Sequence, residues 1–375
     1  MTTAAFYKMN MKSSRKVTSI PQEIIFEIFS LLPVKSLMRF RCISKVYNSL
    51  VSETDFVSIH QSRSMTRIGG IKLLAREREG FYTIEQNEDG EASLLHIEYL
   101  DVLDDYIGSR NLFECVNGLF CFSTWHQPAI IINPSTREIR FLPKIDVNRY
   151  CYCSLGYEPE EKIYKVLYTR FEAFESHARN WIFTLGMDKS WREIESFFLF
   201  PRLNEGVCIN GVIYMLDSFY QRKRIVAFDV KAESFRTITL PCALPDGVDS
   251  YHPHGVDSCH LIEVKGKLSV LENMTDENFN LWILGNGQLQ IWERDTITSS
   301  PGLPRMNFCS HTYDGEIIFV AEVEGDKFTY FSYDITTKSW RKCEVQGSQR
   351  EYSIKGIYRC VENLYPLEKC LVNAR

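Results

Sequence analysis

The stretch AIIINPSTREI, residues 129–139, predicts a tight β-hairpin. Its apolar run ends at Asn133, a turn of small and polar residues follows, and an apolar residue returns at Ile139. The same order recurs in WIFTLGMDKSW (181–191), IVAFDVKAESF (225–235), LWILGNGQLQIW (281–292) and YFSYDITTKSW (330–340). Short runs rich in β-branched and aromatic residues, bounded by turn-forming residues, are typical of antiparallel strands. The repeated hairpin therefore decides the fold of most of the chain.

The hairpins recur at a regular interval. Their turns start at residues 133, 185, 229, 286 and 334, so 44 to 57 residues separate neighbouring copies. A further copy is predicted at a turn around Asn87, 46 residues before the first. A second series of turns lies between the hairpins, at Asn117-Gly118, Asn210-Gly211, Lys265-Gly266 and Asp314-Gly315. Asn-Gly and Asp-Gly pairs adopt the positive φ angles that two-residue hairpin turns need.

A period of roughly 50 residues with about four short strands is typical of a propeller blade. We therefore predict an α+β chain overall, with a mainly β domain that forms a propeller of about six kelch-like blades. A parallel α/β sheet is disfavoured because the connecting stretches lack amphipathic helices. A β-sandwich with long loops stays open as the alternative. The stretch YSIKGIYRCVENL, residues 352–364, is predicted to pair with the first blade and close the ring.

The chain begins differently, with a helical pattern between residues 20 and 50. Ile20, Ile24, Ile28 and Leu32 recur at intervals of four, which places them on one face of an amphipathic helix. A second, shorter pattern follows, and Ser44 is placed to cap a third helix. Three short helices enclose little core, so an apolar face left over on them is expected to be a docking surface.

The residues of this helical front resemble the F-box motif, whose helices dock on the adaptor Skp1. The resemblance spans residues 20 to about 60 and rests on Ile20-Pro21-x-Glu23, Ile28-Phe29-x-x-Leu32-Pro33, Leu37, Cys42-Ile43-Ser44-Lys45-x-Tyr47, Phe56 and His60. Ile20 stands where the family usually has Leu, and Tyr47 where it usually has Trp. Both keep an apolar body, so we expect a modest change in packing. A helical hairpin that only caps the β domain is the alternative.

Three motifs of the β region resemble the F-box-associated domain of a large plant family of F-box proteins. They are CVNGLFCF (115–122), INPSTREIRFLP (132–143) and GYEPEEKIYKVLY (156–168), and the resemblance covers roughly residues 110 to 345. The predicted domains are a flexible tail at 1–19, an F-box at 20–62 and a propeller-like substrate-recognition domain at 63–375.

Composition excludes several classes of protein. The net charge is -5 with both signs mixed along the chain, so no basic face indicates a nucleic-acid partner. The 12 cysteines are scattered without a C-x-x-C pair or a signal peptide, which indicates reduced thiols in the cytoplasm or the nucleus. No apolar run approaches the roughly 18 residues that a membrane helix needs.

No motif in the sequence indicates catalysis, a cofactor or a metal. The chain lacks G-x-S-x-G, G-x-x-x-x-G-K and H-E-x-x-H. The stretch YHPHGVDSCH, residues 251–260, gathers His252, His254, Asp257, Cys259 and His260, but its spacing does not match a structural zinc site. It is predicted to be a loop between blades, and we expect no bound metal.

The resemblance implies a substrate-recognition subunit of a Skp1–cullin–F-box (SCF) E3 ubiquitin ligase. The F-box would bind a Skp1-like adaptor, and through it the cullin and RING subunits. The β domain would bind a target protein, promoting its ubiquitination and proteasomal degradation without catalysis by this chain. The residues predicted to bind Skp1 are Pro21, Glu23, Ile24, Ile28, Phe29, Leu32, Pro33, Leu37, Ile43, Lys45 and Tyr47. The residues predicted to bind the target are Trp125, His126, Arg222, Lys223, Arg224, His252 and His254.

Two other functions stay open at this stage. A β-propeller enzyme or glycan-binding protein with an incidental helical leader would place a polar, titratable cluster at a central channel. An adaptor that binds Skp1 without ligase function would use the β domain in a structural or regulatory complex.

Overall fold

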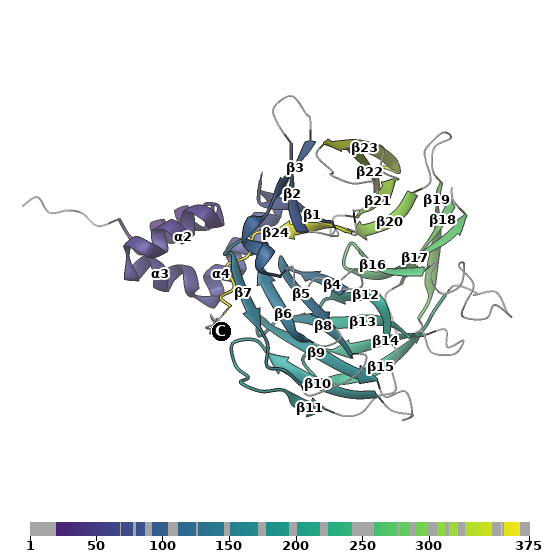
Figure 1. Ribbon diagram of the computed structural model, residues 1–375, viewed down its shortest axis with the longest axis horizontal. Helices are drawn as coiled ribbons and strands as arrows, with labels where there is room; N and C mark the ends of the chain where they lie inside the picture. Colours follow the sequence, from purple (N-terminus) through teal and green to yellow (C-terminus); the bar gives the residue numbers. More distant parts are fainter. Residues whose placement is uncertain are drawn as a thin grey trace, which may run out of the picture.

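A computed structural model gives the fold of most of the chain. The described residues are 20–67, 69–77, 80–86, 92–103, 112–124, 127–145, 151–171, 178–194, 201–217, 224–241, 259–275, 278–285, 290–298, 306–311, 315–321, 327–346, 354 and 356–367. The predicted tail at 1–19 and the turn around Asn87 lie outside these residues. Figure 1 shows the helices on one side of a large β domain, whose sheets follow one another in sequence order.

The described part of the N-terminal region has four helices, where the sequence pattern predicted three. They are α1 (Gln22–Ser30), α2 (Val34–Ile43), α3 (Lys45–Ser52) and α4 (Thr54–Thr66). Ser44 caps α3 as predicted, because its Oγ accepts a hydrogen bond from Tyr47 N. Helix α4 escaped prediction because its buried face includes the polar residues His60, Gln61 and Ser64, which obscure the apolar period. It runs across the predicted domain boundary at residue 62.

The β domain is built from short antiparallel strands. In the first half these are β1 (Ile71–Glu77), β2 (Gly80–Gln86), β3 (Ala92–His96), β4 (Leu112–Val116), β5 (Leu119–Thr124), β6 (Gln127–Asn133), β7 (Glu138–Phe141), β8 (Cys151–Glu158), β9 (Ile163–Phe171), β10 (Ala178–Thr184), β11 (Arg192–Ile194) and β12 (Pro201–Ile209). The second half has β13 (Val212–Asp217), β14 (Arg224–Asp229), β15 (Ser234–Thr239), β16 (Cys259–Val264), β17 (Lys267–Thr275), β18 (Asn278–Leu284), β19 (Trp292–Thr298), β20 (Met306–His311), β21 (Glu316–Ala321), β22 (Lys327–Asp334), β23 (Ser339–Gln346) and β24 (Gly356–Val361). A short 3-10 helix, η1 (Glu98–Leu103), follows β3.

Within the described residues the strands form six four-stranded units. Four are separate sheets, β4–β7, β8–β11, β12–β15 and β16–β19. The eight-stranded sheet contains the other two, β20–β23 and β24-β1-β2-β3, joined by a short parallel pairing of β23 with β3. We call the unit of β24, β1, β2 and β3 blade 1 and number the others in chain order. The predicted propeller of about six blades is confirmed, and the sandwich is wrong.

The ring closes through its last strand. β24 pairs antiparallel with β1 from Ile71 opposite Val361 to Arg76 opposite Gly356. Blade 1 therefore combines strands from both ends of the β region. The predicted closure by the stretch 352–364 is confirmed, and it removes a free edge from β1.

The predicted turns that lie within the described residues are present, whereas those at Asn87 and Asn286 and the residue Asp314 lie outside them. Asn133 and its equivalents open the turn between the third and fourth strands of a blade, and the Asn-Gly type pairs join the first two strands. Asn117 and Gly118 have φ angles of 52° and 81°, and Asn210 and Gly211 have 48° and 81°. Positive φ at both positions is the signature of the hairpin turn that the sequence indicated.

A buried apolar cluster lies between each pair of neighbouring blades. Leu119 and Ile131 of blade 2 pack with Leu155 and Phe183 of blade 3, and comparable clusters join every other pair around the ring. Each blade thus depends on both neighbours for its core, as expected of a repeat architecture.

Antiparallel alternation gives the ring two different faces. In each blade, the turn between the first and second strands and the turn between the third and fourth strands lie on the same face of the ring. We call this face the turn face. The opposite face, where second strands lead to third strands and each blade leads to the next, is the loop face. The helices pack on the turn face, where Gln61 of α4 donates a hydrogen bond to Asn117 O in the β4–β5 turn.

The β4–β5 turn yields a first prediction, because it also touches the closing strand. A Cβ atom on Gly118 would lie 2.0 Å from Val361 O, whereas one on Gly266, at a similar φ of 77°, would meet nothing nearer than 3.7 Å. Gly118→Ala and Gly266→Ala should both cost about 1 kcal/mol of backbone strain. Gly118→Ala should lower the free energy of unfolding by roughly 2 kcal/mol more, measured by chemical denaturation.

The Gly266→Ala variant is the matched control, since its turn has the same backbone geometry without the close carbonyl. Equal destabilisation by the two substitutions would mean that the contact with Val361 is unimportant for closure.

Candidate functional site

The helical unit is held together by a small aromatic core. The ring of Phe29 packs against Phe40 and Tyr47, with centroid distances of 5.0 Å and 4.9 Å, and Phe26 meets Phe56 edge-on at 5.2 Å. Tyr47 therefore packs its ring against this core from a half-buried position, as its apolar body predicts.

His60 closes the same core beside the α1–α2 corner. Its Nε2 lies 2.8 Å from Leu32 O, and its ring stacks on Phe56. Burial lowers the pKa of His60 to about 4, so the imidazole is neutral at physiological pH and can donate to the carbonyl through Nε2.

Two residues predicted to contact Skp1 lie inside this core instead. Phe29 and Leu37 are buried among Val34, Leu50 and Phe56, so their side chains support the helices and present no outer surface. The prediction of direct contact does not fit their positions. Sequence spacing alone does not show which half of an apolar helix face turns inward.

The remaining predicted residues lie nearer the surface. Pro21, Glu23, Ile24, Ile28, Pro33, Ile43 and Lys45 are exposed, and Leu32 and Tyr47 are half-buried. Large apolar side chains are prominent in the exposed set: Ile28 is 48% exposed and Ile43 is 73% exposed. We define the apolar stripe as the exposed residues Ile20, Ile24, Ile28, Leu31, Ile43 and Val46.

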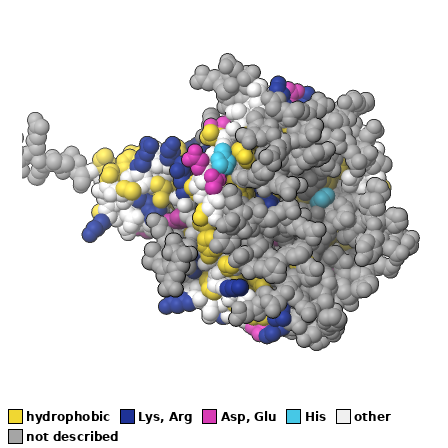
Figure 2. Space-filling view, viewed as in Figure 1, with side chains coloured by type: hydrophobic (Ala, Val, Ile, Leu, Met, Phe, Trp, Pro, Cys, Tyr) yellow, Lys and Arg dark blue, Asp and Glu magenta, His cyan; other side chains and the backbone are white. Residues whose placement is uncertain are grey.

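The apolar stripe adjoins a basic region. Helices α2 and α3 carry Lys35, Arg39, Arg41 and Lys45 and contain no acidic residue. Figure 2 shows hydrophobic and basic side chains gathered on the helical unit. An exposed apolar area with cations at its border is typical of a surface that binds another protein.

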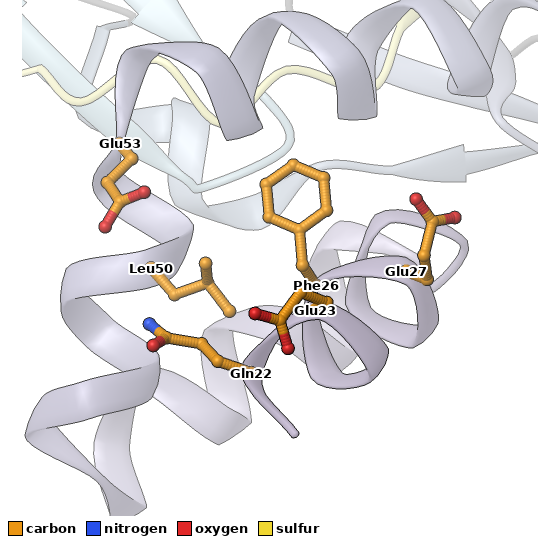
Figure 3. Close-up of a pocket in the computed structure, with 6 residues that line it drawn as sticks. All are labelled: Gln22, Glu23, Phe26, Glu27, Leu50 and Glu53. Atoms are coloured by element: carbon orange, nitrogen blue, oxygen red, sulfur yellow. The ribbon is translucent and has the colours of Figure 1, made fainter. Parts of the chain in front are cut away.

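A cavity of about 330 Å³ opens between α1 and the end of α3. Phe26 and Leu50 form its apolar part, and Gln22, Glu23, Glu27 and Glu53 surround them (Figure 3). Glu27 is engaged by Arg63 of α4, whose Nη1 lies 2.9 Å from its carboxylate. The negative charge of this cavity contrasts with the cations of α2 and α3.

Most residues predicted to bind the target lie outside the described residues. These are Trp125, His126, Arg222, Lys223, His252 and His254. The strands that flank them do end on one side: β5 leads to β6, β13 to β14, and β15 to β16, all on the loop face. The described strand ends that flank them therefore lie on the same face, away from the helices.

Arg224 is a correction to the predicted target surface. It is the first residue of β14, and its Nε donates to Asp217 Oδ2 at 2.5 Å. Asp217 is buried, so the guanidinium compensates a buried carboxylate. Arg224 therefore has a structural partner and is not a free recognition group.

The histidine cluster gives no metal site within the described part of the chain. Cys259 is buried in the first position of β16, and His260 follows it on the other side of the strand. No group of three His, Cys, Asp or Glu side chains among the described residues could hold a metal ion. None of the described helices is long and apolar enough to cross a membrane.

One partly buried carboxylate lies where the inner strands of blades 2, 3 and 4 meet. Glu114 of β4 accepts hydrogen bonds from Ser154 Oγ at 3.0 Å and Leu155 N at 2.6 Å, both in β8. A Cβ on Gly206 of β12 would lie 2.1 Å from Glu114 Oε1. The carboxylate thus bonds blade 2 to blade 3 and lies close to the backbone of blade 4 at Gly206.

Glu114 is also the residue that best tests the enzyme hypothesis. Burial raises its pKa to about 7, a value that would suit a general acid or base. Among the described residues it accepts hydrogen bonds from the Ser154 hydroxyl and the Leu155 backbone amide. The described geometry therefore explains the raised pKa by packing between blades.

Comparison with known families agrees with both parts of this architecture. The F-box domain family matches residues 17–58, and the F-box associated beta propeller domain family matches residues 73–365. F-box protein DOR of Arabidopsis thaliana is 28% identical over 359 residues, covering 88% of each chain. F-box protein At2g21930 of the same plant is 30% identical over 367 residues, covering 88% of this chain and 86% of that protein.

Solved structures are similar only at a distance. The oligogalacturonate lyase of Vibrio parahaemolyticus aligns over 74% of this chain and 80% of its own, with 9% identity and a TM-score of 0.39. At this distance the likeness gives no basis for transferring an activity.

The raised pKa of Glu114 predicts a specific pH dependence. Its folded pKa of about 7 lies above the ordinary 4.5, so between these values the folded state holds a proton that the unfolded state has lost. Stability from this group is therefore present below pH 4.5 and falls as the pH rises to about 7. The free energy of unfolding of Glu114→Gln, relative to that of the wild type, should therefore increase by up to roughly 3 kcal/mol as the pH rises from 4.5 to 8.

The measurement is the free energy of unfolding of both proteins across this pH range. Glu263, whose pKa burial also raises to about 7, is present in both and cancels in the difference. Glu114→Ala is the control, since it removes both acceptors and should destabilise the fold at every pH. If the difference in free energy of unfolding between the wild type and Glu114→Gln does not change with pH, Glu114 does not titrate in this way.

Proposed function

We propose that this chain, which belongs to the F-box proteins that carry an F-box-associated β-propeller domain, is a substrate-recognition subunit of an SCF E3 ubiquitin ligase. The observation that carries the proposal is the apolar stripe. It consists of large aliphatic side chains that the folded chain leaves in water, on a unit that belongs to the F-box family. Such a surface is stabilised when a partner covers it.

The proposed partner for the stripe is a Skp1-like adaptor. The α1 face with Ile24 and Ile28 would lie in an apolar groove of the adaptor, and Ile43 at the α2–α3 corner would extend the contact. The cations of α2 and α3 favour an adaptor with carboxylates beside that groove. Phe29, Leu37 and Tyr47 would act from behind by holding the helices in place.

The proposed target surface is the loop face of the propeller. Loops on a rigid scaffold are the usual location of recognition residues. The helices cover part of the turn face, so a target on the loop face would not compete with the adaptor. Trp125, His126, Arg222 and Lys223 are the proposed target contacts, with His252 and His254 on the connection from blade 4 to blade 5.

The chain itself would perform no chemistry. Ubiquitin transfer would take place on the RING subunit and its partner enzyme, while this chain contributes proximity and orientation. The proposed location is the cytoplasm or the nucleus, where reduced cysteines and the ubiquitin machinery coexist.

The first test of the proposal is a charge on the apolar stripe. Ile28→Asp should weaken binding to a Skp1-like adaptor roughly thirtyfold or more, because a carboxylate would be buried without a partner. The substitution is at a half-exposed position, so the stability of the free chain should change little. Isothermal titration calorimetry with the purified full chain measures the effect.

Ile291→Asp is the matched control, since Ile291 is also a large exposed aliphatic residue, 62% exposed, but lies on blade 5. Its affinity for the adaptor should equal that of the wild type. Unchanged binding by Ile28→Asp would mean that the stripe is not the adaptor surface.

The second test separates a ligase subunit from a non-ligase adaptor. Proximity labelling is carried out in cells that express either the wild-type full chain or its Ile28→Asp variant, under proteasome inhibition. A target should be labelled in both, and its half-life without the inhibitor should be shorter with the wild type only. Adding Arg222→Ala and Lys223→Ala should reduce its labelling.

Identical half-lives for every labelled protein with the two variants would exclude the ligase function. Binding to Skp1 without target turnover would then favour a structural or regulatory complex.

A further inference from the structure

The chain continues beyond the strand that closes the ring. We define the strap as residues Glu362–Leu367, which follow β24 and are the last described residues. Figure 1 shows this yellow segment passing beside α4 and the end of β7, so it lies on the turn face next to the helices. The strap therefore meets both domains of the protein.

The strap completes the core of the F-box unit. Leu364 is 1% exposed and belongs to the cluster of Phe29, Val34, Leu37, Leu50, Val51, Phe56 and Val57. These seven residues come from the four helices, whereas Leu364 comes from the other end of the chain. A unit of this size buries little apolar surface by itself, so one further leucine is a substantial addition.

The strap also caps helix α2. Pro33 precedes the helix and has no side chain that can accept a hydrogen bond from its first turn. Glu362 supplies the missing acceptor: its Oε2 lies 3.2 Å from Val34 N. A carboxylate at this end of a helix is also favoured by the helix dipole.

Arg67 connects the same carboxylate to the α1–α2 corner. Its Nη2 pairs with Glu362, and its Nη1 donates to Leu31 O and Leu32 O, each at 3.0 Å. Leu31 belongs to the apolar stripe. The position of the stripe is therefore coupled, through one arginine, to a residue of the strap.

The strap is fixed equally firmly to the propeller. Asn363 donates from Nδ2 to Asn117 O at 2.7 Å and to Tyr164 OH at 2.9 Å. Asn133 donates from its Nδ2 to Asn363 O and Tyr365 O at 3.1 and 3.0 Å. Asn133 and Asn363 are both fully buried, so each of these hydrogen bonds satisfies a group that water cannot reach.

The backbone carbonyl of Asn117 joins the propeller to both the strap and helix α4. Asn117 O accepts from Asn363 of the strap and from Gln61 of α4, the latter at 2.9 Å. The exposed pair Asp55 and Lys162 adds a contact between α4 and blade 3, but surface ion pairs contribute little. The buried contacts of the strap are the ones that hold the joint.

We propose that the strap is a positioning element for adaptor binding, which completes the F-box core and holds α1 and α2 where the apolar stripe can dock. This inference rests on the proposed function, since it concerns the surface offered to Skp1. It makes adaptor binding depend on residues that follow the closed ring. A chain without the strap would keep the whole F-box motif and still present a defective docking surface.

The test that needs no adaptor is hydrogen exchange of the full chain. Leu364→Ala should leave a cavity and speed exchange of the α1 and α2 amides roughly tenfold to a hundredfold. Glu362→Gln, which keeps the shape of the side chain, should have a smaller effect centred on Val34. The amides of β5 and β6 should exchange as in the wild type.

Pro366→Ala is the matched control, because Pro366 is an exposed residue of the same segment. Unchanged α1 and α2 exchange in Leu364→Ala would overturn the proposal. So would a loss of protection throughout the propeller in both Leu364→Ala and Glu362→Gln, because it would assign the strap to general stability.

Adaptor affinity provides the second readout. Leu364→Ala should weaken binding of Skp1 to the full chain about tenfold, although Leu364 is not part of the stripe. Pro366→Ala should bind like the wild type, and equal affinity for Leu364→Ala would contradict the positioning role. If the wild type itself fails to bind Skp1, the proposed function fails, while the exchange rates of the free chain still decide the role of the strap.

Discussion

The pairing of β24 with β1 is the constraint on which the rest of the structure depends. A propeller blade buries its faces only against two neighbours, so an open ring would expose both faces at the gap. Here the gap is closed by a strand that arrives about 280 residues after its partner, a long-range contact of the kind that forms slowly in folding. The strap continues directly from this strand. Closing the ring therefore also delivers Glu362 and Leu364 to the helices.

Much of the β domain could be predicted because its signals are local. Asn117-Gly118 and Asn210-Gly211 specify turns through their own backbone preferences, and the distance between turns specifies the blade. The exposed half of the F-box face could not be separated from the buried half in the same way. Ile28 and Phe29 are adjacent and both apolar, and only the packing of α1 on three other helices decides that Phe29 turns inward.

The joint between the domains was beyond prediction for a different reason. Gln61, Arg67, Glu362 and Asn363 are polar residues in ordinary positions, and each acquires its role from a partner far away in sequence. Asn133 illustrates the limit. Its turn is predicted by the sequence, and in the structure its Oδ1 accepts a hydrogen bond from Ser135 N within that turn. Its Nδ2 also donates to Tyr365 O of the strap, and no local pattern indicates this second role.

The tight joint has a mechanical consequence for the proposed function. The link from α4 to β1 is short, and Gly70 within it approaches Ser64 so closely that a Cβ would lie 2.2 Å from the carbonyl oxygen. Gly70 O in turn accepts from Glu362 N at 2.9 Å, so the link is bonded to the strap. A target on the loop face would thus be held at a nearly constant distance from the adaptor. If the proposed function holds, ubiquitin transfer would depend on how often a lysine of the bound target meets the enzyme, so a fixed distance would favour targets whose lysines lie at a matching distance from the propeller.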